Sequence, residues 1–239
     1  YLESNNLSRV DAVKRDILEL YHADFKKIDP TGRASMMFDA IPAQLTGNAM
    51  RYQVSSVDNN SRAGQVLDLI AEMVDSGTVN IAYHANDPSV GFAMHKDLEV
   101  FKLYLCDTGL FITLAFWDKD FTENVLYQKL LNDKISTDLG YVYENVVAQM
   151  LVAEGNELFY HTFQSETSHH NHEIDFLLSR DSKICPIEVK SSNYKRHASF
   201  DEFCKKFSAR ILHKYLIYTK DLRKEQDVLY LPTYMAQFL

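Results

Sequence analysis

Residues 173–190 read EIDFLLSRDSKICPIEVK, and the rest of the fold can be predicted outward from them. Two short apolar runs, each carrying charged residues, flank the polar segment Arg180–Lys183, which has the length of a hairpin turn. This pattern predicts two adjacent antiparallel strands. Because charged side chains are rare on a buried strand unless they are paired or used, the same two strands are predicted to carry a functional site.

The charged residues of these strands are predicted to form a metal site. Alternate side chains of a strand share a face, so Glu173 points the same way as Asp175, and Glu188 the same way as Lys190. The apolar residues between them point the other way, into a core. On neighbouring antiparallel strands, Asp175 and Glu188 are within reach of one ion. Mg²⁺ (or Mn²⁺) prefers hard oxygen ligands and keeps several waters, so these two acids are the predicted ligands and Lys190 their cationic partner.

A third acidic residue, Glu144, lies on a predicted helix that follows Gly140. The helix has an apolar stripe at Tyr143, Val147, Met150 and Leu151. Glu144 falls on or beside this stripe, and a carboxylate on a core-facing stripe needs a partner. We expect the metal or Lys190 to supply it.

The order of the predicted elements is helix, three strands, helix, strand. They are the helix with Glu144, the strands Leu158–Gln164, around Asp175 and around Glu188, a helix around Phe200–Arg210, and the strand His213–Tyr218. This order resembles the αβββαβ core of the PD-(D/E)xK, or restriction-endonuclease-like, nucleases over roughly the last hundred residues. The Pro-Asp of the motif name is absent, since Glu173 and Ile174 precede Asp175.

The resemblance implies a role for each matching residue. In that superfamily the acids at the positions of Asp175 and Glu188 bind magnesium. The lysine at the position of Lys190 orients a water or stabilises the pentavalent phosphate, and Glu144 takes the place of the supporting acid on the helix. The resemblance therefore implies a nuclease with these four catalytic residues.

Two functions stay open at this point. A Glu-x-Lys on a strand is usually an ion pair on a solvated face, and many domains of the superfamily kept the fold and lost the reaction. The first function is a metal-dependent nuclease. The alternative is a catalytically inactive nuclease-fold module that serves as an interaction or DNA-binding platform.

Residues 33–105 read as a separate unit. Helices are predicted at Ser35–Leu45, around Ser55 and at Ser61–Asp75, followed by strands at Val79–His84 and Phe101–Leu105. Three helices and a two-stranded ribbon are the plan of a winged helix-turn-helix. The unit has five Lys and Arg against eight Asp and Glu. Because an acidic surface repels phosphate, an interaction or spacer role is favoured over reading DNA.

Positive charge gathers instead after the predicted metal strands. From residue 190 to residue 224 there are ten Lys and Arg against three Asp and Glu, in a chain with a net charge of −8. A basic region beside a metal site suits a phosphate backbone. The predicted nucleic-acid contacts are Lys195, Arg196, Lys205, Lys206 and Arg210.

Composition bounds the class of protein. The 239 residues suffice for two modest domains, and 46% hydrophobic with 24% charged residues is typical of a globular protein. No apolar run approaches the roughly 20 residues of a membrane span, and no signal peptide is visible. Three cysteines without CxxC spacing indicate a reduced, cytoplasmic protein.

The succession of motifs extends the resemblance over nearly the whole chain. In order, the motifs are Ile17–Asp24, Ala40–Leu45, Phe101–Leu110, Gly140 with Glu144, Glu173–Phe176 and Pro186–Lys190. The chain looks like the C-terminal half of a large family of bacterial and archaeal AAA+-type ATPases. In these, a P-loop ATPase domain precedes a winged-helix segment and a nuclease-like domain of unknown function.

This family resemblance implies a mixed α/β protein in three parts. Residues 1–32 are expected to be the helical remnant of an upstream ATPase lid. Their helix is predicted at Ser8–Ile28, with Ser8 as its cap and an apolar stripe at Val10, Val13, Ile17, Leu20, Tyr21 and Phe25. Residues 33–105 form the winged-helix-like domain, and residues 106–239 the restriction-endonuclease-like domain. No glycine here begins a Walker A loop, so ATP is expected only in the missing N-terminal domain. The start at Tyr1 suggests a fragment, and the upstream ATPase domain is the expected partner.

Overall fold

The computed structural model describes residues 6–47, 50–56, 63–118, 140–165 and 170–239. The chain forms two compact units. Unit 1 comprises Tyr1–Asn80 and Leu105–Val142, and unit 2 comprises Ile81–Tyr104 and Tyr143–Leu239. The predicted mixed α/β class is confirmed. Within the described ranges, no helix has both the length and the apolar character of a membrane span.

Unit 1 is helical. Its elements are α1 (Leu7–Ile28), α2 (Arg33–Thr46), the 3-10 helix η1 (Val54–Ser56), α3 (Ala63–Asp75) and α4 (Thr108–Ala115). The first four match the predicted helices closely. Helix α4 is not predicted by the sequence, and it begins where the Asp107 side chain accepts a hydrogen bond from the Leu110 N–H at 2.8 Å.

Helix α1 starts and packs differently from the prediction. Its N-cap is Asn6, whose side chain accepts the Ser8 N–H at 2.9 Å, whereas Ser8 was the predicted cap. The buried face carries Asp11, Leu18 and Phe25, and Leu20 of the predicted stripe is 64% exposed. Asp11 is buried because Arg15 and Thr113 hydrogen-bond its carboxylate, so a charged residue replaces an apolar one on the core face.

The start of α2 is held by Asp29. Its Oδ1 accepts the Thr31 N–H at 3.1 Å and the Thr31 hydroxyl at 2.5 Å, and its Oδ2 accepts the Ala34 N–H at 3.1 Å. These bonds satisfy donors that the first turn of a helix leaves without an intrahelical partner. Between them, Gly32 has φ +81°, a conformation that favours glycine.

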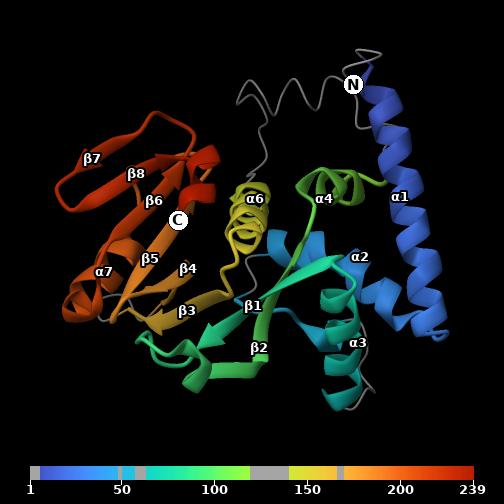
Figure 1. The fold of residues 1–239 in the computed structure, drawn as a ribbon, viewed down its shortest axis with the longest axis horizontal. Coiled ribbons are helices and arrows are strands. Elements are labelled where there is room, and N and C mark those ends of the chain that lie inside the picture. The colour runs from blue at the N-terminus through green and yellow to red at the C-terminus, as the bar shows by residue number, and fades with distance from the viewer. Residues whose placement is uncertain (1–5, 48–49, 57–62, 119–139, 166–169) are drawn as a thin grey trace. The chain divides into compact units, whose positions relative to one another are not determined.

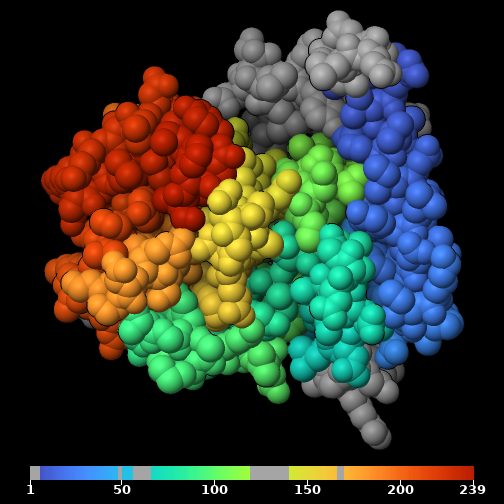
Figure 2. Space-filling model, in the orientation of Figure 1, coloured from blue at the N-terminus to red at the C-terminus, as the bar shows by residue number. Residues whose placement is uncertain are grey.

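Unit 2 is built on one mixed sheet in the strand order β2-β1-β3-β4-β5-β6-β8-β7 (Figure 1). The strands are β1 (Val79–Ala85), β2 (Lys96–Leu105), β3 (Leu158–Gln164), β4 (Asn171–Arg180), β5 (Lys183–Lys190), β6 (Lys214–Tyr218), β7 (Arg223–Glu225) and β8 (Val228–Pro232). The helical elements of this unit are η2 (Phe92–Met94), α6 (Gly140–Ala153), α7 (Ala198–Lys206), η3 (Ser208–Arg210) and η4 (Thr233–Phe238). In Figure 2 the orange-to-red surface of residues 170–239 is one continuous body.

The predicted order of helix, three strands, helix and strand is present as α6, β3, β4, β5, α7 and β6. Strands β4 and β5 are antiparallel neighbours with Phe176 opposite Ile187, so the predicted hairpin is confirmed. Strand β6 runs parallel to β5, and β8 parallel to β6. The β7–β8 hairpin was not predicted.

The two strands predicted to form the wing lie in this sheet instead. Strand β1 pairs in parallel with β3, with Ala82 opposite Leu158, and β2 lies at the outer edge next to β1. Ala82 and Ala85 are fully buried, which suits a strand inside a larger sheet better than an isolated ribbon. The division of the chain into units therefore falls within β1 and β2 rather than after residue 105.

The core of unit 2 packs α7 against the sheet. Phe200 and Phe203 of α7 are fully buried with Ile174, Leu177 and Ile184 of β4 and β5. Each such aromatic side chain removes a large apolar area from water. This packing holds β4 and β5 in place, and it leaves the charged side chains of the two strands to be accommodated elsewhere.

Candidate active site

Asp175 and Glu188 lie side by side on β4 and β5. The register of the two strands, with Phe176 opposite Ile187, brings the two acids next to each other. Both are buried, with 9% and 3% of their surface exposed. Asp175 Oδ2 accepts the backbone N–H of Val189 at 2.7 Å, which fixes the carboxylate across the strand pair. The structure therefore brings together the two predicted metal ligands.

Lys190 is the third predicted residue that joins them. Its Nζ lies 2.7 Å from Glu188 Oε1, and the rest of its side chain is half-buried. The other oxygen of Glu188, Oε2, is buried and has no hydrogen-bond partner among the described residues. A buried carboxylate oxygen without a donor is costly, so this atom is the point at which a ligand would be most stabilising.

Glu144 is also at this site, but its partner is not the predicted one. The Tyr104 hydroxyl donates to Glu144 Oε2 at 3.4 Å, and Lys102 Nζ lies 3.9 Å from the same oxygen. Sequence reasoning assigned this role to a metal or to Lys190. Both actual partners come from β2, about forty residues earlier in the chain.

Lys102 is the residue that sequence reasoning missed. It is 5% exposed, and its ammonium group pairs with Glu173 and lies 5.3 Å from the ring centre of Tyr160. The signal was present in the sequence, because Lys102 stands in the apolar run Phe101–Leu105. The rule that pointed to Glu188, a charge on a buried strand, applies equally to this lysine.

Burial shifts the acids toward their neutral forms. It raises the pKa of Glu188 to about 8, with repulsion from Asp175 adding to the shift and Lys190 opposing it. Burial likewise raises the pKa of Glu144 to about 8, opposed by Lys102. The pKa of Asp175 is also raised by burial, against the attraction of Lys190. A cation bound here would displace these protons, since metal ligands must be ionised.

The two lysines keep their charge. Burial acts to lower the pKa of Lys102 and of Lys190, but the surrounding acidic groups outweigh it, and both pKa values are raised. Each lysine is therefore an ammonium group in contact with carboxylates. An ammonium group in this position can stabilise negative charge brought to the site.

The donor set fits one hard cation. No group of three or more His, Cys, Asp or Glu suited to holding a metal is found in the described part of the chain. Asp175 and Glu188 supply two carboxylates, and Mg²⁺ is commonly held by one or two carboxylates with waters completing the shell. The bare Oε2 of Glu188 is the observation that favours a cation at this pair.

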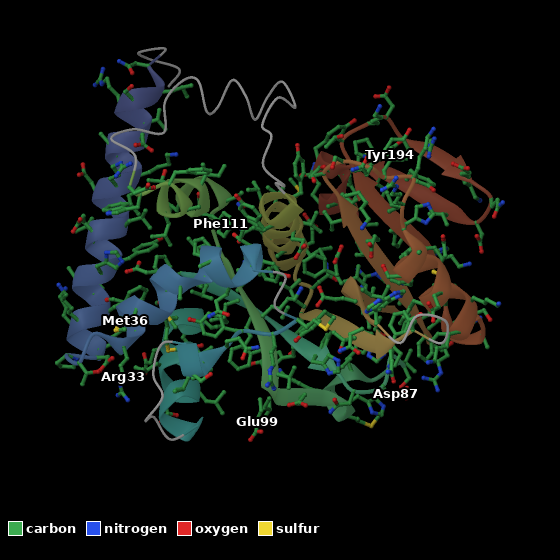
Figure 3. All side chains as sticks on the ribbon, turned by 180° about the vertical axis from the view of Figure 1, so that it is seen from behind. Arg33, Met36, Asp87, Glu99, Phe111 and Tyr194 are labelled. Atoms are coloured by element: carbon green, nitrogen blue, oxygen red, sulfur yellow. The ribbon has the colours of Figure 1, made fainter. Side chains whose placement is uncertain are left out.

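The predicted nucleic-acid contacts fall into two groups. Lys195 and Arg196 are exposed on the segment after β5, next to Tyr194, which is labelled in Figure 3. Lys205 and Lys206 are exposed in the last turn of α7. Arg210 follows in η3, and its charge is matched by an ion pair with Asp87 at 2.5 Å. The first group lies five and six residues after Lys190, closer to it in the chain than the second group.

A second feature that the sequence did not reveal lies on the strand beside Lys190. The register places Lys190 opposite Tyr218 of β6. Tyr218 packs against Tyr194 and Tyr230, with ring centres 5.2 Å and 5.6 Å away, and the guanidinium of Arg223 lies 4.2 Å from the centre of the Tyr230 ring. Because Tyr218 and Tyr230 are buried, with 2% and 4% of their surface exposed, these contacts belong to the core around β6 and β8.

Comparison with known proteins finds two matching families. Residues 1–120 match the model of a family described as Domain of unknown function (DUF8612), and residues 139–234 match one described as Domain of unknown function (DUF4143). Glu144, Asp175, Glu188 and Lys190 lie in the second match, and Lys102 in the first. The comparison with curated proteins found no match.

Among solved structures, the crystal structure of protein VC1899 from Vibrio cholerae is similar at 9% identity with a TM-score of 0.30. The similarity covers 98% of this chain and 55% of that chain. The chain thus spans about half the length of the structure it matches.

Proposed function

The chain belongs to the family described as Domain of unknown function (DUF8612), and we propose that its C-terminal half forms a magnesium-dependent phosphodiesterase site that acts on nucleic acid. One observation carries the proposal. Two buried carboxylates, Asp175 and Glu188, lie next to an ammonium group, Lys190, and one buried oxygen of Glu188 has no donor among the residues that the structure describes. This is the donor set that metal-assisted phosphodiester cleavage requires.

Each residue has a defined part in this proposal. Asp175 and Glu188 would hold the cation. When bound, Mg²⁺ lowers the pKa of a coordinated water and offsets charge on the phosphate. The ammonium group of Lys190 orients the attacking water or neutralises charge that develops on the phosphate oxygens. Glu144, held by Tyr104, supports the arrangement from α6.

Substrate binding is assigned to the basic segment that follows β5. Lys195 and Arg196 are exposed five and six residues beyond Lys190, and cations there can contact the phosphate backbone on either side of the reacting phosphate. Such contacts position the strand without reading its sequence, so we expect cleavage with little sequence preference. We also expect binding to weaken as salt rises.

The match to the second family supports a partnership with an ATPase. Domains of the DUF4143 kind are usually C-terminal domains associated with AAA-type ATPases. We therefore propose that this chain works next to such an engine, which would deliver or gate the nucleic acid.

The test is cleavage by the purified chain. Single-stranded, duplex and branched DNA, and RNA, are incubated with Mg²⁺ or Mn²⁺ and with EDTA. We expect metal-dependent cleavage that Lys190→Ala lowers by at least about 100-fold, on the scale of losing a transition-state charge contact. The matched control is Lys183→Ala, which removes an exposed lysine from the other end of the same strand. Equal activity of the wild type and Lys190→Ala would refute the assignment of Lys190.

A second function is favoured by one specific observation. Lys190 already pairs with Glu188, and Lys102 with Glu173, so the carboxylates are partly neutralised without a cation. A catalytically inactive module that binds nucleic acid or a protein would have this property. In that case no cleavage occurs, Lys190→Ala leaves binding unchanged, and Arg196→Glu or Lys205→Glu weakens it.

A further inference from the structure

We infer that Lys102 is a built-in counter-cation that restricts the site to a single divalent ion. The inference rests on the proposed function, because it takes Asp175 and Glu188 as the place where a cation binds. It goes beyond that function because it assigns a positioning role to Lys102 of β2 and states that the site binds one divalent ion rather than two.

The geometry places Lys102 between two carboxylates. Its ammonium group is in contact with Glu173 and lies 3.9 Å from Glu144 Oε2, and only 6% of its side chain is exposed. Two residues further along the same strand, the Tyr104 hydroxyl donates to Glu144. Strand β2 therefore provides a cation for both outer acids and a hydrogen-bond donor for one of them.

Lys102 divides the four acids into two pairs with different tasks. Glu144 and Glu173 are neutralised by a group whose removal would leave two half-buried carboxylates without a cation. Asp175 and Glu188 keep the vacant oxygen, Glu188 Oε2, which no described residue contacts by a hydrogen bond. A cation is thus directed to the inner pair and kept from the outer one.

The charge balance leads to the same number of ions. When all groups are ionised, four carboxylates and two ammonium groups leave a net charge of −2 on the cluster. One divalent cation neutralises that charge. A second would leave an excess of +2 in a buried place, where unbalanced charge is costly. Without Lys102 the net charge becomes −3, and the outer pair becomes free to bind a second ion.

This role makes the site depend on both halves of the chain. Lys102 and Tyr104 lie outside the matched residues 139–234, which contain Glu144, Glu173, Asp175, Glu188 and Lys190. A C-terminal domain of that extent alone would lack the counter-cation and the donor to Glu144. The segment that contains β2 is therefore part of the site rather than a neighbouring domain.

The test counts bound ions on the whole chain. Mn²⁺ binding is measured by isothermal titration calorimetry, and electron paramagnetic resonance reports whether two bound ions are close. We expect one Mn²⁺ in the wild type and two in Lys102→Met. The control, Lys183→Met, removes an exposed lysine from β5 and is expected to bind one. A single bound ion in Lys102→Met would overturn the inference.

A second variant keeps the inference testable if Lys102→Met does not fold. Lys102→Met/Glu173→Gln removes one cation and one anion, so the net charge of the cluster stays at −2. We expect one Mn²⁺, because neither group is a ligand and the charge that one divalent ion neutralises is unchanged. Two bound ions, or none, would overturn the inference, because the number of ions would then not follow the charge of the cluster.

The same measurements separate the inference from the proposed function. If Asp175→Asn and Glu188→Gln leave Mn²⁺ binding unchanged, or if the wild type binds none, the metal site itself is refuted, and the inference falls with it. If those variants abolish binding while Lys102→Met still binds a single ion, the metal site stands and only the role of Lys102 is refuted.

Discussion

Glu188→Gln is expected to stabilise the metal-free protein at neutral pH. Glu188 is 3% exposed, and burial beside Asp175 raises its pKa to about 8 from an ordinary value of 4.5. A raised carboxyl pKa means that the folded state holds a proton more tightly than the unfolded state. Stability therefore falls as pH rises from about 4.5 towards 8, because the unfolded chain gains by releasing that proton.

The size of the effect follows from the pKa shift. A pH of 7 lies about 2.5 units above the pKa of the unfolded carboxyl, and each unit corresponds to about 1.4 kcal/mol. Keeping Glu188 protonated in the folded state therefore lowers the free energy of unfolding at pH 7 by about 3 kcal/mol. Glutamine has the same shape and needs no proton. Its amide oxygen still accepts from Lys190, which is 2.7 Å from Glu188 Oε1. We expect Glu188→Gln to recover about 2 to 3 kcal/mol at pH 7.

The assay is urea denaturation of the whole chain in EDTA, followed by circular dichroism at pH 7.0 and pH 4.5. The gain should shrink below about 0.5 kcal/mol at pH 4.5, where the folded carboxyl is protonated in any case. Glu154→Gln, at an exposed position in the turn directly after α6, is the matched control and should change neither value. A Glu188→Gln protein that is no more stable than wild type at pH 7 would refute the assignment of Glu188 as a buried, functionally retained carboxyl.

Three further outcomes are expected. Asp29→Ala should cost about 1 to 2 kcal/mol at pH 7, measured by urea denaturation, because the start of α2 loses the bonds from Thr31 and Ala34. Burial opposes ionisation of Asp29, but those hydrogen bonds outweigh it and lower the pKa of the carboxyl. Their contribution to the free energy of unfolding is therefore present above about pH 4 and is lost as the pH falls through the lowered folded pKa. An equal cost of Asp29→Ala at pH 2 would contradict the assignment. Phe200→Ala should cost about 3 to 5 kcal/mol in the same assay, since the side chain is fully buried between α7 and the sheet, and a cost below 1 kcal/mol would contradict that packing. Mg²⁺ at 100 times its Kd should stabilise the wild type by about 2.7 kcal/mol and leave the stability of Asp175→Asn unchanged. The measurement is the thermal midpoint of unfolding with and without Mg²⁺, and an equal shift in both proteins would place the ion elsewhere.

Elements with a clear local signal were predicted well. The strand Leu158–Gln164 was predicted with its observed bounds, and the β4–β5 hairpin followed from two apolar runs around a polar turn. Helix α4 was missed because its sequence, TGLFITLA, is apolar almost throughout and shows no helical periodicity. The buried face of α1 was predicted wrongly because it includes Asp11, whose burial depends on partners that a hydrophobic pattern does not register.

The basic surface was also predicted only in part. The sequence located the positive charge after β5, but it could not tell which cations are already paired. Arg210 is matched by Asp87, more than a hundred residues earlier, whereas Lys195 and Arg196 are exposed. Pairing of this kind depends on contacts between distant segments, and it changes how much of the predicted surface is open to a phosphate backbone.

The sequence by itself determined the inner part of the candidate site. Alternation along β4 and β5 and a short turn between them are local properties, and together they place Asp175 and Glu188 side by side, with Lys190 beside Glu188. Only the tertiary structure decided that β1 and β2 join the same sheet and bring Lys102 to Glu144 and Glu173. The physical reason is that β1 pairs with a strand some 76 residues away, with Ala82 opposite Leu158. Such pairing is selected by the packing of whole layers, which no short stretch of residues encodes.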